Sequence, residues 1–210
     1  MSPLRKPFSY TYINAALIIV ALNVAVYLLM GMSGLPTGYV GLSVIGMLRG
    51  HFWWQPLTYM FVHGGFSHIF FNMFGLLVFG IPVERKLGSK EFLLLYLLCG
   101  VLDGLVSLAV YWLSGMYYVV LIGASGALYS ILLVFAVIYP RSIISVFGII
   151  PVPAPLFVLA YTLIELGNQF FGSSNVAHLT HLAGFVLAWL YLVIRLDLHP
   201  IKIWKDAWRR

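Results

Sequence analysis

The sequence predicts an all-α membrane protein, folded as a bundle of six transmembrane helices. Of the 210 residues, 62% are hydrophobic and only 9% are charged, which is more apolar surface than a soluble domain of this length can bury. The apolar residues also gather in runs, most of them near the roughly twenty residues that cross a hydrocarbon core of about 30 Å. These runs cover Tyr12–Met30, Ser67–Val83, Glu91–Leu113, Val119–Tyr139, Leu156–Phe171 and Ala177–Ile194.

The first run is predicted to be a retained helix. It follows a short basic tail, is too long for a signal peptide and lacks a cleavage site of the A-x-A type. The connection after it, residues 31–66, is too apolar for a solvated loop and too rich in glycine for a clean span. We therefore expect it to be half immersed in the membrane and partly helical, with Trp53 and Trp54 at the level of the lipid headgroups.

The second and third runs carry polar side chains where a membrane makes them costly. His68 and Asn72 open the second run one turn apart, and therefore on one face. The third run holds Asp103 and the only cysteine, Cys99, so an intramolecular disulfide is excluded. For Asp103, as for Glu165 in the fifth run, we favour a structural hydrogen-bonding role over a functional one.

The fourth and sixth runs carry small residues at helical spacing. Gly123 with Ala127 and Gly126 with Ser130 form pairs four residues apart in the stretch GASGALYS, and Gly184 with Ala188 forms another in the sixth run. Such pairs let two helices approach closely, so packing alone is a sufficient explanation of this stretch when it is read by itself. In the fifth run the stretch PVPAP favours an extended approach, and the helix is expected to begin near Leu156.

The polar residues of three runs share one depth. At about 1.5 Å per residue, Ser125 is expected about 9 Å below the outer end of the fourth helix and His181 about 6 Å below that of the sixth. His68 and Asn72 enter from the same side. A serine hydroxyl becomes a good nucleophile only when a base takes its proton, and histidine is the usual base.

The same level also offers donors for the oxyanion of an acyl-transfer reaction. These are the backbone amide of Ser125, a ring nitrogen of His68 and the side-chain amide of Asn72. Tyr129, one turn below Ser125, would stack on or orient the imidazole of His181. No acidic residue is well placed to be the third member of a Ser-His-Asp triad, so a Ser-His dyad is preferred. The G-x-S-x-G motif of α/β-hydrolases is excluded, because Ala127 stands where the motif has glycine. No metal or cofactor is expected.

The basic residues fall almost entirely on alternate connections, and only Arg49 lies on the other side. By the positive-inside rule, both termini are predicted to be cytoplasmic and the loops 31–66, 114–118 and 172–176 to face outward. The net charge of +6 is then explained by topology and contact with anionic membrane lipids, and requires no nucleic acid. The cytoplasmic set is Arg5, Lys6, Arg85, Lys86, Lys90, Arg141, Arg195, Lys202, Lys205, Arg209 and Arg210.

We expect one domain over residues 1–210, with cytoplasmic tails at 1–11 and 195–210. The second tail combines basic and aromatic residues and is expected to lie along the inner interface. The protein is predicted to be a multi-pass integral membrane protein, of the plasma (inner) membrane if it is prokaryotic.

Three ordered pieces of the sequence resemble the rhomboid family of intramembrane serine proteases. They are HGGFSHIFFNMFGLLVFGIPVERKLGS from His63 to Ser89, GASGALYS from Gly123 to Ser130 and AHLTHLAGF from Ala177 to Phe185. They span most of the second, fourth and sixth helices in the family's order. A lone G-x-S-G would be weak, whereas this combination is highly specific.

The resemblance implies a serine endopeptidase with Ser125 as nucleophile and His181 as general base. His68 and Asn72 would help the Ser125 amide to form the oxyanion hole. His181 is preferred to His178 because Gly184 follows it at the spacing of the family's H-x-x-G motif. Gly123, Gly126 and Gly184 would support the site by close packing.

The resemblance also implies features away from the dyad. His63 would be structural, Glu84 with Arg85 would close the cytoplasmic end of the second helix, and the fifth helix would act as a lateral gate. Substrates would be single-span membrane proteins cut near the outer membrane face. The chain departs from many members by having Gln55 after Trp54 in place of an arginine, which puts the anchoring of the first loop in question.

Two other functions remain open at this point. A catalytically silent rhomboid-like binder of transmembrane helices would need no activated serine. A small transporter would give Asp103 and Glu165 a role in an ion pathway, but the sequence has no inverted repeats and no broken segments at these residues.

Overall fold

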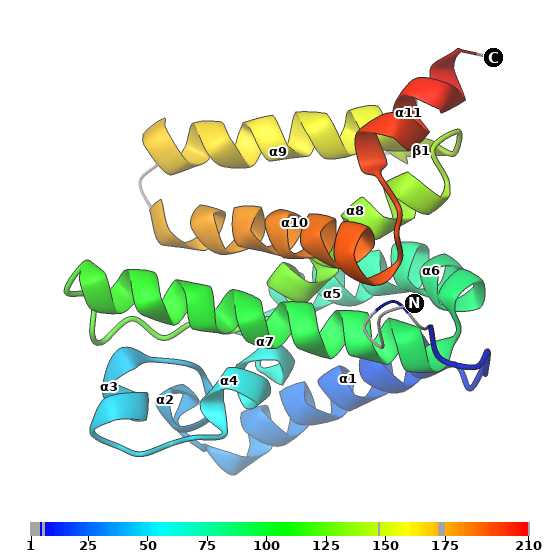
Figure 1. The fold of residues 1–210 in the computed structure, drawn as a ribbon. Coiled ribbons are helices and arrows are strands. Elements are labelled where there is room, and N and C mark those ends of the chain that lie inside the picture. Colours follow the sequence, from blue (N-terminus) through cyan, green and yellow to red (C-terminus); the bar gives the residue numbers. More distant parts are fainter. Residues whose placement is uncertain (1–4, 6, 147, 172–174, 210) are drawn as a thin grey trace.

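The computed structural model describes residues 5, 7–146, 148–171 and 175–209, and within these ranges the side chains of all residues except 165, 167–171 and 175–180. The described chain is mainly helical, with one short β-hairpin (Figure 1). Its elements in chain order are α1 (Ala15–Ser33), α2 (Thr37–Val40), α3 (Val44–Leu48), α4 (Gln55–Thr58), η2 (Tyr59–Phe61), α5 (Phe66–Gly75), η3 (Leu76–Gly80), α6 (Ile81–Leu87), α7 (Ser89–Leu113), α8 (Ser125–Ile138), β1 (Ile143–Val146), β2 (Ile150–Pro153), α9 (Ala154–Phe171), α10 (Asn175–Arg195) and α11 (Pro200–Trp208).

Helix α8 forms the centre of the bundle. Eleven of its 14 residues are buried, and it packs against α7, α9, α10 and the continuous helix made by α5, η3 and α6. The exposed large side chains belong mostly to the surrounding helices, as a lipid-facing surface requires. A helix enclosed on all sides can be apolar all round, which is the pattern of residues 131–138.

Among the described residues, three helices are long and apolar enough to cross a membrane: α1, the α5–α6 helix over Phe66–Leu87, and α7. The part of α10 from His181 passes the same test only together with α11, from which it is bent by 88°. Helix α8 and the Ala154–Ile164 part of α9 are apolar but shorter. The helical membrane protein is therefore confirmed, while the count of six spans and the single domain stay predictions.

The fourth helix is shorter than predicted. We expected it over Val119–Tyr139, but residues 119–124 are not helical and α8 begins at Ser125. Leu121 instead exchanges two backbone hydrogen bonds with Leu42 of the first loop, of 2.8 and 2.9 Å, and the N–H of Gly123 donates to the carbonyl of Tyr59. These bonds satisfy the backbone from outside the helix, which allows irregular chain inside a membrane protein.

A β-hairpin, which the sequence analysis did not predict, separates α8 from α9. Strands β1 and β2 are antiparallel, with Ile143 opposite Pro153 and Val146 opposite Ile150. The prolines of PVPAP do favour an extended chain, as expected, and the helix after them begins at Ala154, two residues before Leu156.

The first loop is partly helical, as predicted, and Gln55 holds it together. The Gln55 side chain is fully buried; its Oε1 accepts from the N–H of Ser43 at 3.1 Å, and its Nε2 donates to the carbonyl of Gly38 at 2.8 Å. The indole N–H of Trp54 donates to the carbonyl of Tyr39. A glutamine therefore supplies the anchoring that an arginine was expected to provide.

Two buried carboxylates tie helices together at the end of the bundle where α1 begins and α10 ends (Figure 1). Glu84 accepts from the N–H groups of Ala15 and Ala16, at the start of α1, and so fills the positive end of that helix. Glu91 of α7 binds Arg195 of α10 through two N–H···O contacts of 2.8 and 3.0 Å. Glu84 therefore links the end of the α5–α6 helix to the start of α1, a contact that was not predicted.

Candidate active site

Ser125, the first residue of α8, and His181, the seventh residue of the neighbouring α10, lie in contact. The Oγ of Ser125 is 3.0 Å from Nε2 of His181. Both residues are half buried. A hydroxyl and an imidazole at this distance have the geometry of a nucleophile and a general base.

The two helices approach closely because small residues line their contact. A Cβ atom added to Gly184 would lie 2.5 Å from the carbonyl oxygen of Gly126, a distance that real side chains do not show. The hydroxyl of Ser130 donates to the carbonyl of Gly184 at 2.8 Å, and Ala188 is fully buried. Gly184, Ser130 and Ala188 thus lie where the predicted close packing requires them.

Two other glycines are small for reasons that the sequence analysis missed. A Cβ atom on Gly126 would lie 1.9 Å from Oδ2 of Asp103, so this side of Gly126 faces α7 and not α10. Gly123 lies before the helix, with a φ of +111°, and a Cβ atom there would lie 2.6 Å from Nε2 of His68. The expected packing of Gly123 against the sixth helix is therefore wrong.

Tyr129 covers one face of the His181 ring. The two rings are stacked with 4.2 Å between centroids and 7° between planes, and the ring of Phe185 meets Tyr129 edge to face at 5.2 Å. This is the position expected one turn below Ser125. The stack restricts the orientation of the imidazole and keeps Nε2 directed at the serine.

The start of α8 at Ser125 places backbone donors at the candidate site. The first hydrogen bond to a residue four back runs from Leu128 to Ala124, so the amides of Ser125, Gly126 and Ala127 have no acceptor inside the helix. The helix dipole adds partial positive charge at the same end. Ser125 was expected within the helix, and its actual place at the N-terminus suits a developing oxyanion better.

His68 lies directly beside this turn, and Asn72 follows it on α5. The N–H of Gly64 donates to Nδ1 of His68 at 3.4 Å, so the neutral ring carries its proton on Nε2, the nitrogen next to Gly123. The amide of Asn72 is buried and donates one hydrogen to the carbonyl of His68 at 2.8 Å. A second hydrogen remains on that nitrogen.

The sequence was compared with known proteins. The family model described as the Rhomboid domain matches residues 49–198, which is most of the chain. The chain belongs to the rhomboid family. Among its relatives, the putative rhomboid protease YdcA of Bacillus subtilis is 29% identical over 152 residues, which are 70% of either chain.

Two further relatives are also named as rhomboid proteases. AarA of Providencia stuartii is 30% identical over 60% of this chain and 51% of its own length. GlpG of Pectobacterium atrosepticum is 25% identical over 82% of this chain and 59% of its own length. The chain thus spans little more than half the length of these two rhomboids.

His63 of this rhomboid chain supports the His68 ring. The two imidazoles meet edge to face, with 5.0 Å between their centroids. Burial, and secondly the nearby His68, lower the pKa of His63 from 6.5 to about 4. His63 is therefore neutral near pH 7 and adds no charge beside His68.

The structural hydrogen-bonding role that we favoured for Asp103 stays a prediction. Its side chain is fully buried on α7, and neither carboxyl oxygen accepts a hydrogen bond from the described residues. It is therefore not hydrogen bonded to His181 as the acid of a triad would be. The side chains of Glu165 and His178 lie outside the described residues. Within the described part of the chain, no group of three or more His, Cys, Asp or Glu residues could hold a metal ion.

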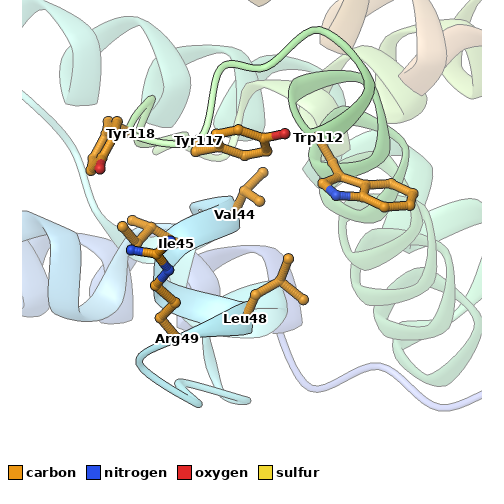
Figure 2. A pocket seen from close by; sticks show the side chains of 7 residues that line it. All are labelled: Val44, Ile45, Leu48, Arg49, Trp112, Tyr117 and Tyr118. Atoms are coloured by element: carbon orange, nitrogen blue, oxygen red, sulfur yellow. The ribbon is translucent and has the colours of Figure 1, made fainter.

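A hollow of about 320 Å³ between the first loop and the connection from α7 to α8 was not predicted (Figure 2). Arg49 is the only charged residue in its wall, and none of the predicted site residues lines it. It is therefore separate from the Ser125–His181 contact. Its lining residues are Val44, Ile45, Leu48, Arg49, Trp112, Tyr117 and Tyr118.

Proposed function

We propose that the protein is an intramembrane serine endopeptidase that uses Ser125 and His181 as a catalytic dyad. The observation that carries this proposal is the 3.0 Å contact between Ser125 Oγ and His181 Nε2 at the N-terminus of a buried helix. Membership of the rhomboid family and the names of its protease relatives support the same reaction.

The contact supports the following sequence of steps. His181 Nε2 takes the proton of Ser125 as Oγ forms a bond to the carbonyl carbon of the substrate. The protonated ring then donates this proton to the leaving amine as the peptide bond breaks. A water molecule next gives its proton to Nε2 and its oxygen to the acyl carbon. Collapse of this second intermediate returns the proton to Ser125 and releases the carboxylic acid product.

The oxyanion formed in both halves of the reaction is stabilised by three donors in this proposal. The amide of Ser125 lies at the positive end of α8, Nε2–H of His68 lies beside Gly123, and Asn72 has a spare amide hydrogen. Such donors act mainly in the transition state, because the negative charge exists only there. They should therefore affect turnover more than substrate binding.

The proposed substrates are single-span membrane proteins, cut near the outer membrane face. Support for this comes from the family resemblance and from the position of Ser125 at the end of α8 that faces the first loop. Helix α9 is the proposed lateral gate. Water must also reach Ser125, and the first turn of α8, half buried and next to irregular backbone, is where it would enter.

The proposal is tested with an activated-serine probe and a substrate in the same membranes. We expect fluorophosphonate labelling and cleavage of a reconstituted single-span protein by the unaltered chain, and loss of both in Ser125→Ala and in His181→Ala. Ser67→Ala is the matched control, since Ser67 is exposed on α5 and should leave both signals unchanged.

Persistent cleavage by purified Ser125→Ala would refute the assignment. If the unaltered, folded chain binds transmembrane helices but is never labelled and never cleaves them, the catalytically silent binder is correct instead. Mass spectrometry of the products from a panel of single-span substrates then gives the position of the cut.

The role of Asn72 has a separate test with a close structural control. Asn23 on α1 is buried and donates to the carbonyl four residues back at 2.8 Å, as Asn72 does on α5. Asn72→Ala should lower turnover by about 10²-fold or more with little change in substrate binding, which is the usual effect of losing one oxyanion donor. Asn23→Ala should leave turnover intact. Equal turnover in both variants would remove Asn72 from the site.

A further inference from the structure

Helix α11 is held across the end of the bundle. It is bent by 88° from the part of α10 that begins at His181. The indole N–H of Trp204 donates to the carbonyl of Ala136 in α8 at 2.9 Å, and the Trp204 ring meets that of Trp189 edge to face. Figure 1 shows α11 at the end of the bundle that also carries β1. A helix bent in this way does not continue the direction of α10, and its basic and aromatic residues are those of a helix that lies along a membrane surface.

A hollow of about 600 Å³ opens between α10 and α11. One wall is apolar and comes from α10, through Trp189 and Val193. The other wall is basic and comes from Lys202 and Lys205 of α11 and from Arg209, which directly follows this helix; all three are exposed. The remaining lining residues are His199, Pro200, Ile201 and Asp206.

The charges of this hollow favour an anion. Lys202, Lys205 and Arg209 contribute three positive charges and Asp206 one negative charge, so these four side chains give an excess of two positive charges. Cations next to a membrane-crossing helix attract anionic lipid headgroups. The apolar wall favours a ligand that also carries a hydrocarbon chain. Such a chain would cover Trp189 and Val193, which a free anion would leave exposed.

We propose that this hollow binds one anionic phospholipid, with its phosphate against Lys202, Lys205 and Arg209 and an acyl chain along Trp189 and Val193. This ligand fits both walls, because its phosphate matches the basic wall and its acyl chain matches the apolar wall. Inorganic phosphate would use only the basic wall, and a zwitterionic phospholipid would bring a cationic group against three others. The site lies apart from Ser125 and does not depend on the proposed protease activity.

The test measures lipid retention by the purified chain of residues 1–210. Native mass spectrometry of the detergent-solubilised protein is carried out with phosphatidylglycerol and with phosphatidylcholine of the same acyl chains. The unaltered chain should retain one phosphatidylglycerol in preference to phosphatidylcholine. The variant Lys202→Gln/Lys205→Gln should bind phosphatidylglycerol about 30-fold more weakly, since each of the two surface cations contributes about 1 kcal/mol to the attraction.

The matched control removes the same charge elsewhere. Lys86 and Lys90 are exposed lysines outside the hollow, and Lys86→Gln/Lys90→Gln should keep the retention of the unaltered chain. Fluorophosphonate labelling and the thermal unfolding midpoint should stay the same in both variants, which separates lipid binding from folding.

Three results would overturn the proposal. Equal loss in the two lysine pairs would show diffuse charge attraction without a site. Equal retention of phosphatidylcholine would show that the headgroup charge is not recognised. Displacement of phosphatidylglycerol by millimolar inorganic phosphate would show a site for a free anion.

Discussion

At the scale of single residues, Gly126 is where the geometry of the candidate site is most sensitive. Its Cα faces the carboxyl of Asp103 on α7, and its carbonyl faces Gly184 on α10. Gly126→Ala would place a methyl group 1.9 Å from Asp103 Oδ2. Such overpacking costs about 1–3 kcal/mol and displaces backbone, here the turn that carries Ser125. We expect fluorophosphonate labelling to fall sharply and the thermal unfolding midpoint to decrease.

A second substitution tests whether this contact is the cause. Asp103→Ala removes the colliding carboxyl, so the double variant Gly126→Ala/Asp103→Ala should recover much of the labelling that Gly126→Ala loses. Gly184→Ala is the matched control, because its added methyl group meets the backbone oxygen of Gly126, which no side-chain substitution removes. If Asp103→Ala rescues both glycine variants equally, the contact with Asp103 is not specific.

The residues of the site could be predicted better than their packing partners. Ser125, His181, His68 and Asn72 stand out because polar side chains are rare in apolar runs. The stack of Tyr129 on His181 followed from helical spacing. In contrast, spacing along one helix does not say which neighbour a glycine faces. Gly123 was expected to pack against α10 but faces His68, and Gly126 meets Asp103 of α7 as well as Gly184 of α10. The sequence could not predict either that the Asp103 carboxyl has no hydrogen-bond partner among the described residues.

At the scale of elements, the first loop fixes the chain that enters α8. Residues 42, 45 and 59 of the loop make backbone hydrogen bonds with residues 121, 117 and 123. The run from Val119 is as apolar as the helix after it, so composition could not mark the start at Ser125. The helix begins at Ser125 because the residues before it pair with a loop that is distant in the sequence. The hairpin of β1 and β2 was missed for a related reason, since its four-residue strands stabilise each other only once paired.

This dependence predicts the effect of Gln55 on the site. Gln55→Ala leaves the N–H of Ser43 and the carbonyl of Gly38 without their partner inside the protein. A buried polar group left unsatisfied costs about 1–3 kcal/mol, so the thermal unfolding midpoint should drop and labelling of Ser125 should fall with it. Trp53→Ala serves as the control in the same loop, because the Trp53 side chain is 65% exposed. A Gln55→Ala protein with unchanged stability and labelling would show that the loop does not position α8.

At the scale of the whole molecule, α1 begins and α10 ends at one end of the bundle, and β1 lies at that end too (Figure 1). The last turns of α6, with Arg85 and Lys86, and of α10, with Arg195, lie at this end, whereas α3, which Arg49 follows, lies at the other. The helical class and the arrangement of the termini could be predicted because hydropathy and charge act along the whole chain. The side of the membrane on which each end lies remains a prediction of the positive-inside rule.

Cysteine labelling tests the predicted orientation in the membrane, because the sequence contains a single cysteine. The single native cysteine, Cys99, is 1% exposed and can be replaced by alanine to give a silent background. Tyr118 and Ile149 are 76% and 81% exposed and lie in the connections at opposite ends of α8. In intact cells, an impermeant maleimide should modify Tyr118→Cys and not Ile149→Cys, which should react only after permeabilisation. The reverse pattern would invert the orientation and place the Ser125 end of α8 on the cytoplasmic side. Labelling of both sites in intact cells would show that α8 and its neighbours do not separate two compartments.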